Sequence, residues 1–197
     1  TGGADVPNMR QVIQDRMKKM NKSCACIRCH EIKNRKIEYT LKTDMYWYNS
    51  SSGKECFISV YEDNPDKKYI LGFGRLRFAN DPGLYRETEH YINGIKDCAL
   101  LRELHVYGKV NFVDGEKKSN NQHKGIGKKI INCAESLAGG KGYKLAIISG
   151  VGVRNYYRKL GYELIDGYMV KDTSKKYFCR DLLTIFVFLT ITVLLKY

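Results

Sequence analysis

Acidic side chains are scarce in this sequence. Asp and Glu number 21 against 34 Lys and Arg, so the formal net charge is +13 and the pI is near 9.4. Lys and Arg gain free energy on polyanions, because counterions are released when phosphates are neutralised. The composition therefore favours RNA, DNA, a phosphorylated cofactor or an anionic membrane as a partner, although a surface that serves only solubility has the same composition.

Several signatures are also absent. The sequence contains no internal repeat, no Walker A motif and no Gly-x-Gly-x-x-Gly pattern, which argues against the P-loop and dinucleotide-binding classes. The seven cysteines are odd in number and follow no cleavable leader, so they favour a reducing compartment over a disulfide framework. The chain begins with Thr1 rather than Met, from which we expect an upstream portion of a longer protein.

The apolar pattern predicts one α+β domain with an appendage at each end. Residues 8–20 have helical spacing, with Asn8 as the expected N-cap, and this helix is expected to pack onto the domain as a connector. From about 43 to 113, alternating apolar and polar residues predict consecutive strands of a mostly antiparallel sheet. A helix over 126–138, a buried strand over 144–152, a helix over 153–161 and a strand pair over 162–171 follow. The predicted parts are a connector over 1–40, a domain over 41–174 and a tail over 175–197.

The tail contains an uncharged apolar run over 182–195, with Lys175, Lys176 and Arg180 before it and Lys196 after it. About 14 helical residues span roughly 21 Å, short of the hydrocarbon core of about 30 Å, although residues from 178 to 197 lengthen the run. We expect a tail anchor in the mitochondrial outer membrane or the endoplasmic reticulum, with the domain facing the cytosol. The alternative is a buried terminal strand in a cytoplasmic or nuclear protein.

A glycine pair marks the most distinctive turn. The stretch QHKGIGKK over 122–129 lies between a predicted strand and a predicted helix. Gly125 and Gly127 let a ligand approach the backbone closely, and the N–H groups and dipole at a helix start favour an anion. Pyrophosphate is the natural occupant of such a turn. A second motif, Tyr-x-Lys-x-Gly-Tyr over 157–162, follows the next predicted strand.

These segments resemble a known superfamily. The glycine turn and the tyrosine motif are similar to those of the acetyl-CoA-dependent N-acetyltransferases called GNAT. Five ordered segments resemble the C-terminal acetyltransferase domain of the Elongator catalytic-subunit family: RLR at 75–77, RELHVYG at 102–108, QHKGIG at 122–127, ISGVGVRNYYRKLGY at 148–162 and YMVK at 168–171. The resemblance covers nearly all of residues 5–172 and implies the GNAT fold, a mixed, mostly antiparallel sheet flanked by helices.

The resemblance implies an acetyl-CoA site. The residues implied to bind the cofactor are Glu103, Leu104, His105 and Val106 at the pantetheine arm, Gln122, Gly125, Ile126, Gly127, Lys128 and Lys129 at the pyrophosphate, and Asn155 and Tyr157. Tyr157 is implied to protonate the departing thiolate, since a phenol with a pKa of about 10 can donate to a thiolate. Glu103 or His105 is a candidate base near the acetyl group. Each of these three side chains could instead be a packed polar group of the core.

Three cysteines form a candidate metal site. Cys24, Cys26 and Cys29 place three thiols within six residues, a turn that can direct them at one structural zinc ion. The candidates for the fourth ligand are Cys98, which we prefer, His30 and Cys56. Free thiols in a reducing cell are the alternative. The spacing is not that of the radical-SAM cluster of the resembled family, so a [4Fe–4S] cluster and S-adenosylmethionine are expected only in an upstream portion.

The resemblance implies the acetyl-CoA-binding half of an enzyme that makes a C5 carboxymethyl group on the wobble uridine of tRNA. The basic residues expected to contact tRNA phosphates are Lys18, Lys19, Arg28, Lys33, Arg35 and Lys36. Other Elongator subunits or a second copy of the chain are further expected partners, as is a membrane through the tail. Two alternatives are acetylation of lysine in histones or other proteins, and an inactive scaffold that binds CoA or RNA.

Overall fold

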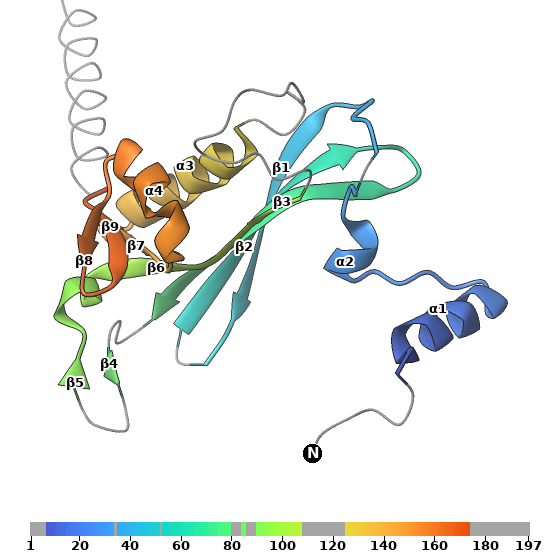
Figure 1. The fold of residues 1–197 in the computed structure, drawn as a ribbon, viewed down its shortest axis with the longest axis horizontal. Coiled ribbons are helices and arrows are strands. Elements are labelled where there is room, and N and C mark those ends of the chain that lie inside the picture. The colour runs from blue at the N-terminus through green and yellow to red at the C-terminus, as the bar shows by residue number, and fades with distance from the viewer. Residues whose placement is uncertain are drawn as a thin grey trace, which may run out of the picture.

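The computed structural model describes residues 7–33, 35–51, 53–79, 84–85, 90–107 and 125–173. Figure 1 shows a twisted sheet, with α3 and α4 close together at one end and α1 set apart near the N-terminus. The helices are α1 (Met9–Lys19), α2 (Ile27–His30), α3 (Ile126–Gly139) and α4 (Arg154–Lys159), with the 3-10 turns η1 (Asn93–Ile95) and η3 (Val151–Val153). The strands are β1 (Leu41–Asn49), β2 (Gly53–Asp63), β3 (Lys68–Ala79), β4 (Leu84–Tyr85), β5 (His90–Tyr91), β6 (Cys98–Val106), β7 (Lys144–Ile147), β8 (Glu163–Ile165) and β9 (Tyr168–Lys171).

Within these ranges, seven strands form one sheet in the order β1-β2-β3-β6-β7-β9-β8, and β4 pairs with β5 separately. Strands β1, β2 and β3 form an antiparallel meander, and β3 pairs antiparallel with β6. The β6–β7 pair is parallel, and α3 lies on the connection between these two strands. The predicted α+β architecture with a mostly antiparallel sheet is confirmed.

Helix α3 covers one face of the sheet because its apolar side chains recur at helical spacing. Ile126, Ile130 and Ile131 are all at least 96% buried. Gly72 and Gly74 of β3 lie beneath the helix, where an added Cβ would lie 3.2 Å and 2.7 Å from methyl carbons of Ile130. These glycines let α3 approach the strand closely. Because side chains alternate along a strand, Phe73, which lies between the two glycines, points to the opposite face of the sheet.

The structure differs from the sequence prediction in the connector. Helix α1 has the expected position, but none of its residues is buried, and Val12, Ile13 and Met20 are about half exposed. The expected packing of this helix onto the domain is therefore wrong. The Asn8 side chain makes no capping hydrogen bond; its carbonyl oxygen instead accepts from the N–H groups of Gln11 and Val12. Strand β7 also ends at Ile147 rather than at 152, because the chain turns into η3.

Candidate active site

The candidate site begins where β6 and β7 separate. The parallel pairing runs from Cys98 opposite Lys144 to Leu101 opposite Ile147. A last hydrogen bond joins the Ile148 N–H to the Leu101 carbonyl at 3.2 Å. Strand β6 then continues to Val106 with no partner strand on that side among the described residues. Its backbone groups there can pair with an extended ligand that carries amides, in the manner of an added strand.

A β-bulge lies at the same place. Arg75 of β3 pairs with Glu103, whereas the next residue, Leu76, pairs with Leu101, so Arg102 is an extra residue in β6. A bulge bends its strand and redirects side chains. Arg102 therefore joins Glu103 on the face away from α3, where its guanidinium reaches the carboxylate of Glu55 at 3.1 Å.

The first turn of α3 lies beside the free end of β6. Gly125 has φ +88°, a left-handed conformation that favours glycine, and it immediately precedes the helix. An added Cβ at Gly127 would lie 3.5 Å from the Tyr156 hydroxyl and 3.6 Å from a methyl group of Val106. Helix α3 is long enough to direct its unpaired N–H groups and dipole at an anion in front of this turn.

Other predicted pyrophosphate residues have distinct positions. Ile126 is 96% buried and packs in the core, so only its backbone is available to a ligand. Lys128 and Lys129 are exposed in the first turn of α3. Gln122 lies outside the described residues. The structure thus brings the two glycines and the two lysines together at one helix start.

Apolar side chains remain exposed around the separating strands. Val106 is 40% exposed and Ile148 is 51% exposed, and in η3 Val151 and Val153 are 76% and 41% exposed. Exposed apolar residues gathered at one place favour a ligand with aliphatic parts. The strand opening therefore combines free backbone groups, apolar walls and a helix start that suits an anion.

The predicted residues of β6 divide between the two faces. Leu104 packs against the core on the α3 side, and Val106 lies on the same side next to Gly127. Glu103 and His105 lie on the opposite face. The Glu103 carboxylate is 46% exposed and lies 3.7 Å from the Arg75 guanidinium, and His105 stacks on Phe73 with ring centroids 5.9 Å apart.

Tyr157 lies in the core between two other tyrosines. It is 5% exposed, and its ring makes edge contacts with Tyr156 and Tyr162 at centroid distances of 5.3 Å and 5.9 Å. Burial, with a smaller contribution from Tyr156, raises the pKa of Tyr157 to about 12. This phenol keeps its proton at neutral pH, so it suits a proton donor and not a base. Asn155 is exposed in the same helix and accepts a hydrogen bond from Arg158 at 2.7 Å.

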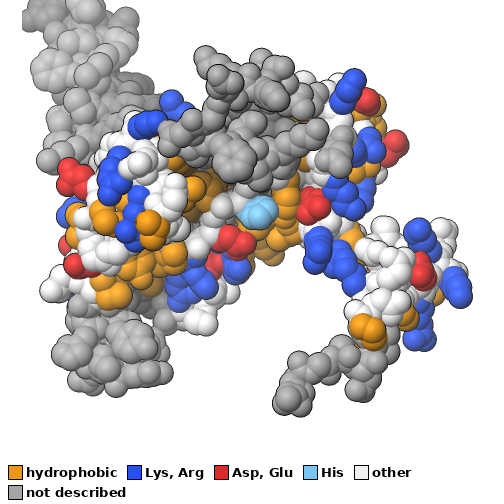
Figure 2. Space-filling view, in the orientation of Figure 1, with side chains coloured by type: hydrophobic (Ala, Val, Ile, Leu, Met, Phe, Trp, Pro, Cys, Tyr) orange, Lys and Arg blue, Asp and Glu red, His pale blue; other side chains and the backbone are white. Residues whose placement is uncertain are grey.

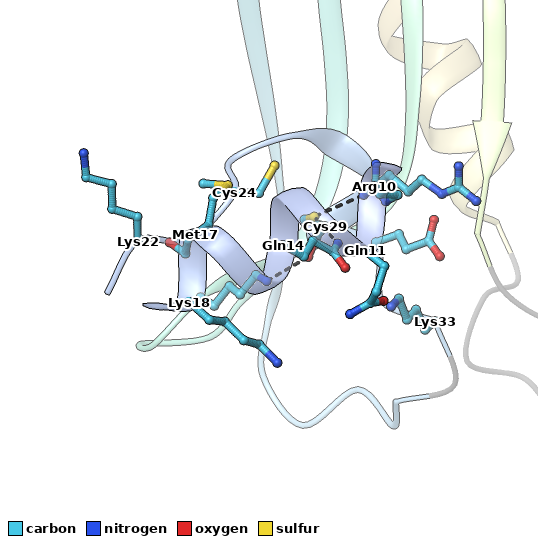
Figure 3. Close-up of a pocket in the computed structure, with 13 residues that line it drawn as sticks. Arg10, Gln11, Gln14, Met17, Lys18, Lys22, Cys24, Cys29 and Lys33 are labelled. Atoms are coloured by element: carbon cyan, nitrogen blue, oxygen red, sulfur yellow. Dashed lines mark hydrogen bonds between the residues drawn. The ribbon is translucent and has the colours of Figure 1, made fainter. Parts of the chain in front are cut away.

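The structure places the thiols of the three clustered cysteines close together. The sulfur atoms of Cys24, Cys26 and Cys29 all lie within 4.8 Å of one another. The Arg10 guanidinium of α1 lies 3.2 Å from the Cys29 sulfur and 3.7 Å from the Cys26 sulfur, as Figure 3 shows for Cys29. Hydrogen bonds, chiefly from Cys24 and then from Arg10, lower the pKa of Cys26 to about 6. A site with thiolate character therefore lies at the junction of α1 and α2.

The preferred fourth ligand does not join this cluster. Cys98 is 2% exposed in a second small core with Ile95, Ala146 and Val170, and its thiol lies 3.7 Å from the Gly94 carbonyl. Burial raises the pKa of Cys98 to about 11. The prediction that Cys98 is the fourth zinc ligand is therefore wrong. A buried neutral thiol on β6 packs as a small apolar side chain.

The two other candidates for the fourth ligand also lie apart from the three sulfur atoms. Cys56 is fully buried in the main core. The His30 ring nitrogen Nδ1 lies 3.1 Å from the Cys26 carbonyl oxygen. Among the described residues, no further His, Cys, Asp or Glu ligand atom completes the cluster within 4.8 Å of each sulfur.

A basic pocket of about 600 Å³ lies between α1 and the cysteine turn. The cations that line it are Arg10, Lys18, Lys22, Arg28, Lys33 and Lys67, against the single acid Glu31 among its lining residues. Figure 3 shows Lys18, Lys22 and Lys33 extending from its walls, and Figure 2 shows Lys and Arg on both sides of the gap between α1 and the sheet. Such a concentration of cations favours a polyanion.

Sequence comparison identifies relatives of this chain. No family model matches the chain. Over 179 residues it is 37% identical to Elongator complex protein 3 of Homo sapiens and 36% identical to that of Danio rerio, in matches that cover 87% of this chain and 31% of each relative. The chain belongs to the Elongator complex protein 3 family. It is also 41% identical over 171 residues to the tRNA uridine(34) acetyltransferase of Dehalococcoides mccartyi, with 83% of this chain and 34% of the relative covered.

A solved structure shares the fold. The archaeal Methanocaldococcus infernus Elp3 with an N-terminal deletion superposes with a TM-score of 0.66 at 31% identity, over 84% of this chain and 39% of that one. The chain spans about a third of the length of the curated relatives in this family that it matches. The resemblance predicted from the motifs is thereby confirmed.

The predicted localisation is corrected. We expected a tail anchor in the mitochondrial outer membrane or the endoplasmic reticulum, whereas the relatives are named for the Elongator complex and for tRNA uridine modification. Within the described ranges, no helix has both the length and the apolar character needed to cross a bilayer. Residues 175–197 lie outside those ranges. The membrane is accordingly dropped as a partner.

Proposed function

We propose that the chain is the acetyl-CoA-binding, GNAT-type part of an enzyme that modifies the wobble uridine of tRNA. The observation that carries this proposal is the separation of β6 from β7 directly beside the glycine turn that opens α3. One strand edge suits the amides of pantetheine, and one helix start suits a pyrophosphate. The name of the Dehalococcoides mccartyi relative supports uridine 34 as the acceptor.

The residues would act in sequence along the opening between β6 and β7. The N–H groups of the first turn of α3, with Lys128 and Lys129, would hold the pyrophosphate. The edge of β6 from Glu103 to Val106 would align the pantetheine, so that the acetyl group lies where the strands separate. Bound acetyl-CoA would supply the two-carbon unit of the C5 carboxymethyl group. Water would add to the thioester carbonyl and give the carboxylate, and Tyr157 would give its proton to the CoA thiolate that departs.

Acetyl-CoA binding tests this proposal directly. Gly127→Ala is expected to raise the acetyl-CoA dissociation constant at least about tenfold, or about 1.4 kcal/mol, because the methyl group occupies the approach to the helix N–H groups. The fold tolerates this methyl group, whose nearest contacts would be ordinary at 3.5 Å and 3.6 Å. Isothermal titration calorimetry measures the effect. Gly140→Ala, at the other end of the same helix, is the matched control and should bind as the wild type does. A wild-type chain without acetyl-CoA affinity would exclude the proposed function.

The basic pocket supports tRNA as a partner. Six cations around one acidic group fit phosphates, which position a nucleic acid without reading its sequence. Lys18, Arg28 and Lys33 of the predicted set line this pocket. Other Elongator subunits or a second copy remain proposed partners, because the relatives are named as parts of that complex. The [4Fe–4S] cluster and S-adenosylmethionine would belong to the part of the family that this chain does not span.

We further propose that the three clustered thiols hold a structural zinc ion. Zinc–thiolate bonds of about 2.3 Å place tetrahedral sulfurs about 3.8 Å apart, which fits three sulfurs within 4.8 Å. Purified chain is expected to carry about one zinc per molecule by elemental analysis, and Cys29→Ser should lose most of it. Cys133→Ser, at a half-buried thiol of α3, should keep its zinc. Equal zinc in both variants would contradict the assignment.

A further inference from the structure

The sheet face opposite α3 carries aromatic and charged side chains over four strands, of which the rings of Tyr46 and His105 are exposed, while Phe73 is 5% exposed. Phe73 stacks on Phe57 with ring centroids 5.2 Å apart and on His105 at 5.9 Å, so one row of rings crosses β2, β3 and β6. On β1, Tyr46 pairs in register with Phe57 and is 69% exposed. The exposed rings of Tyr46 and His105 offer flat surfaces for stacking, and the buried ring of Phe73 supports His105 from within the sheet.

A buried carboxylate fixes two arginines beside these rings. Glu55 is fully buried and accepts from Arg75 at 2.7 Å, from Arg102 at 3.1 Å and from the Tyr48 hydroxyl at 2.7 Å. The Arg75 and Arg102 side chains are 38% and 41% exposed, so part of each guanidinium faces solvent in a fixed orientation. Planar guanidinium groups held in a fixed orientation can donate hydrogen bonds to phosphate oxygens.

A third arginine near Glu55 has a different role. Arg77 is only 15% exposed, and it donates to the Ser50 hydroxyl at 3.2 Å and to the Ser51 carbonyl. Its donors are therefore used within the protein, where they hold the β1–β2 turn. Only Arg75 and Arg102 present a cationic surface from this cluster, and Arg102 does so because the bulge in β6 turns it to this face.

We propose that this face, the open-face platform of Tyr46, Phe57, Arg75, Arg102 and His105, binds single-stranded RNA. The two arginines contact backbone phosphates, and unstacked bases lie on the exposed rings. The platform adjoins Glu103, two residues beyond Leu101, where β6 leaves β7, so bound RNA reaches the place where a thioester would lie. The biological role of the platform thus rests on the proposed function, whereas its affinity for RNA does not.

The charges favour RNA over a lysine-bearing peptide as the occupant. The carboxylates beside the arginines, Glu55 and Glu103, both pair with Arg75, at 2.7 Å and 3.7 Å. Together with Arg102, which also pairs with Glu55, the arginine charges balance both carboxylates and weaken their attraction for a lysine ammonium group. The overall charge of +13 acts in the same direction, because it repels basic peptides and attracts nucleic acid.

Fluorescence anisotropy with a labelled ten-nucleotide oligouridylate, over a series of KCl concentrations, tests the platform on the full chain. The double variant Arg75→Gln/Arg102→Gln should reduce the slope of log affinity against log salt by about 1.4, at about 0.7 for each phosphate contact of a single strand. Tyr46→Ala should weaken binding at least about fivefold with an unchanged slope, since stacking is uncharged. Lys54→Gln is the control, because it removes a neighbouring exposed charge of β2 from the opposite face.

The outcomes separate the alternatives. An equal loss of slope in Lys54→Gln, or unchanged RNA binding in all variants, would overturn the proposal. Competition by oligoglutamate as strong as by unlabelled RNA would also overturn it, in favour of a protein-binding surface. If the double variant unfolds on a thermal melt, Tyr46→Ala and photocrosslinking of 4-thiouridine RNA to wild-type Tyr46 or Phe57 decide instead. Acetyl-CoA titration of the same wild-type preparation tests the proposed function separately.

Discussion

Replacement of Tyr157 by phenylalanine is expected to slow the release of CoA thiol from acetyl-CoA by a factor of about 10² to 10⁴, the usual contribution of a positioned proton donor. The affinity for acetyl-CoA should change little, because the ring and its packing against Tyr156 and Tyr162 remain. A thiol-reactive dye reports the release from the full-length protein in the presence of tRNA.

Tyr156→Phe is the matched control for this result. Tyr156 is adjacent in sequence, and its hydroxyl lies near Gly127 at the start of α3. This variant should retain most of the rate and alter mainly the affinity. Equal rate losses in the two variants would remove Tyr157 as the specific donor. Because the pKa of Tyr157 is about 12, its ionisation should not limit the wild-type rate between pH 6 and pH 9, which are about three units or more below that pKa.

The second large effect concerns Glu55. Glu55→Gln is expected to lower the free energy of unfolding by about 3 kcal/mol, because removal of one member of a buried ion cluster leaves the others without compensation. The value is at the low end of the range for buried pairs, since Arg75 and Arg102 are more than a third exposed and solvent screens them. Urea unfolding measures the change. Glu163→Ala, at an exposed position on β8, should change stability by less than about 0.5 kcal/mol.

The same carboxylate predicts a dependence of stability on pH. Burial alone would raise the pKa of Glu55, but hydrogen bonds from Tyr48 and Arg75 and the charges of Arg75 and Arg102 lower it overall from its ordinary value of 4.5. A lowered pKa in the folded state contributes stability that is fully present above pH 4.5 and is lost as the pH falls through the folded-state pKa. The stability difference between wild type and Glu55→Gln should therefore shrink in acid. A constant difference down to pH 2 would contradict this role.

Much of the fold could be predicted from the sequence because apolar periodicity was strong. The helix from Ile126, the strand from Lys144 and the final strand pair lie close to their predicted positions. The glycine turn was found because a left-handed residue before a helix leaves a visible signature at Gly125. Helices, strands and turns of this kind could be predicted because they depend on residues that are neighbours in the chain.

Features that depend on distant residues were missed. The role of Glu55 follows from arginines on two other strands, so the residues next to it in the chain carry no signal of that role. The bulge at Arg102 has no local signal, since it appears only in the register against β3. Cys98 was assigned to the metal cluster because its position in three dimensions could not be inferred from spacing. The contact of Arg10 with the cysteines likewise depends on how α1 lies against α2.

The parallel pairing of β6 with β7 has a consequence for the order in which the molecule assembles. The β1–β2–β3 meander joins residues that are close along the chain, so little loop entropy opposes its formation. The pairing of Cys98 with Lys144 must close a much longer segment, and it then supplies only a four-residue ladder. We therefore expect the meander to form early and the β6–β7 junction to close late. The place where β6 and β7 separate is then the part of the sheet that we expect to open at the lowest free-energy cost, without disturbing the meander.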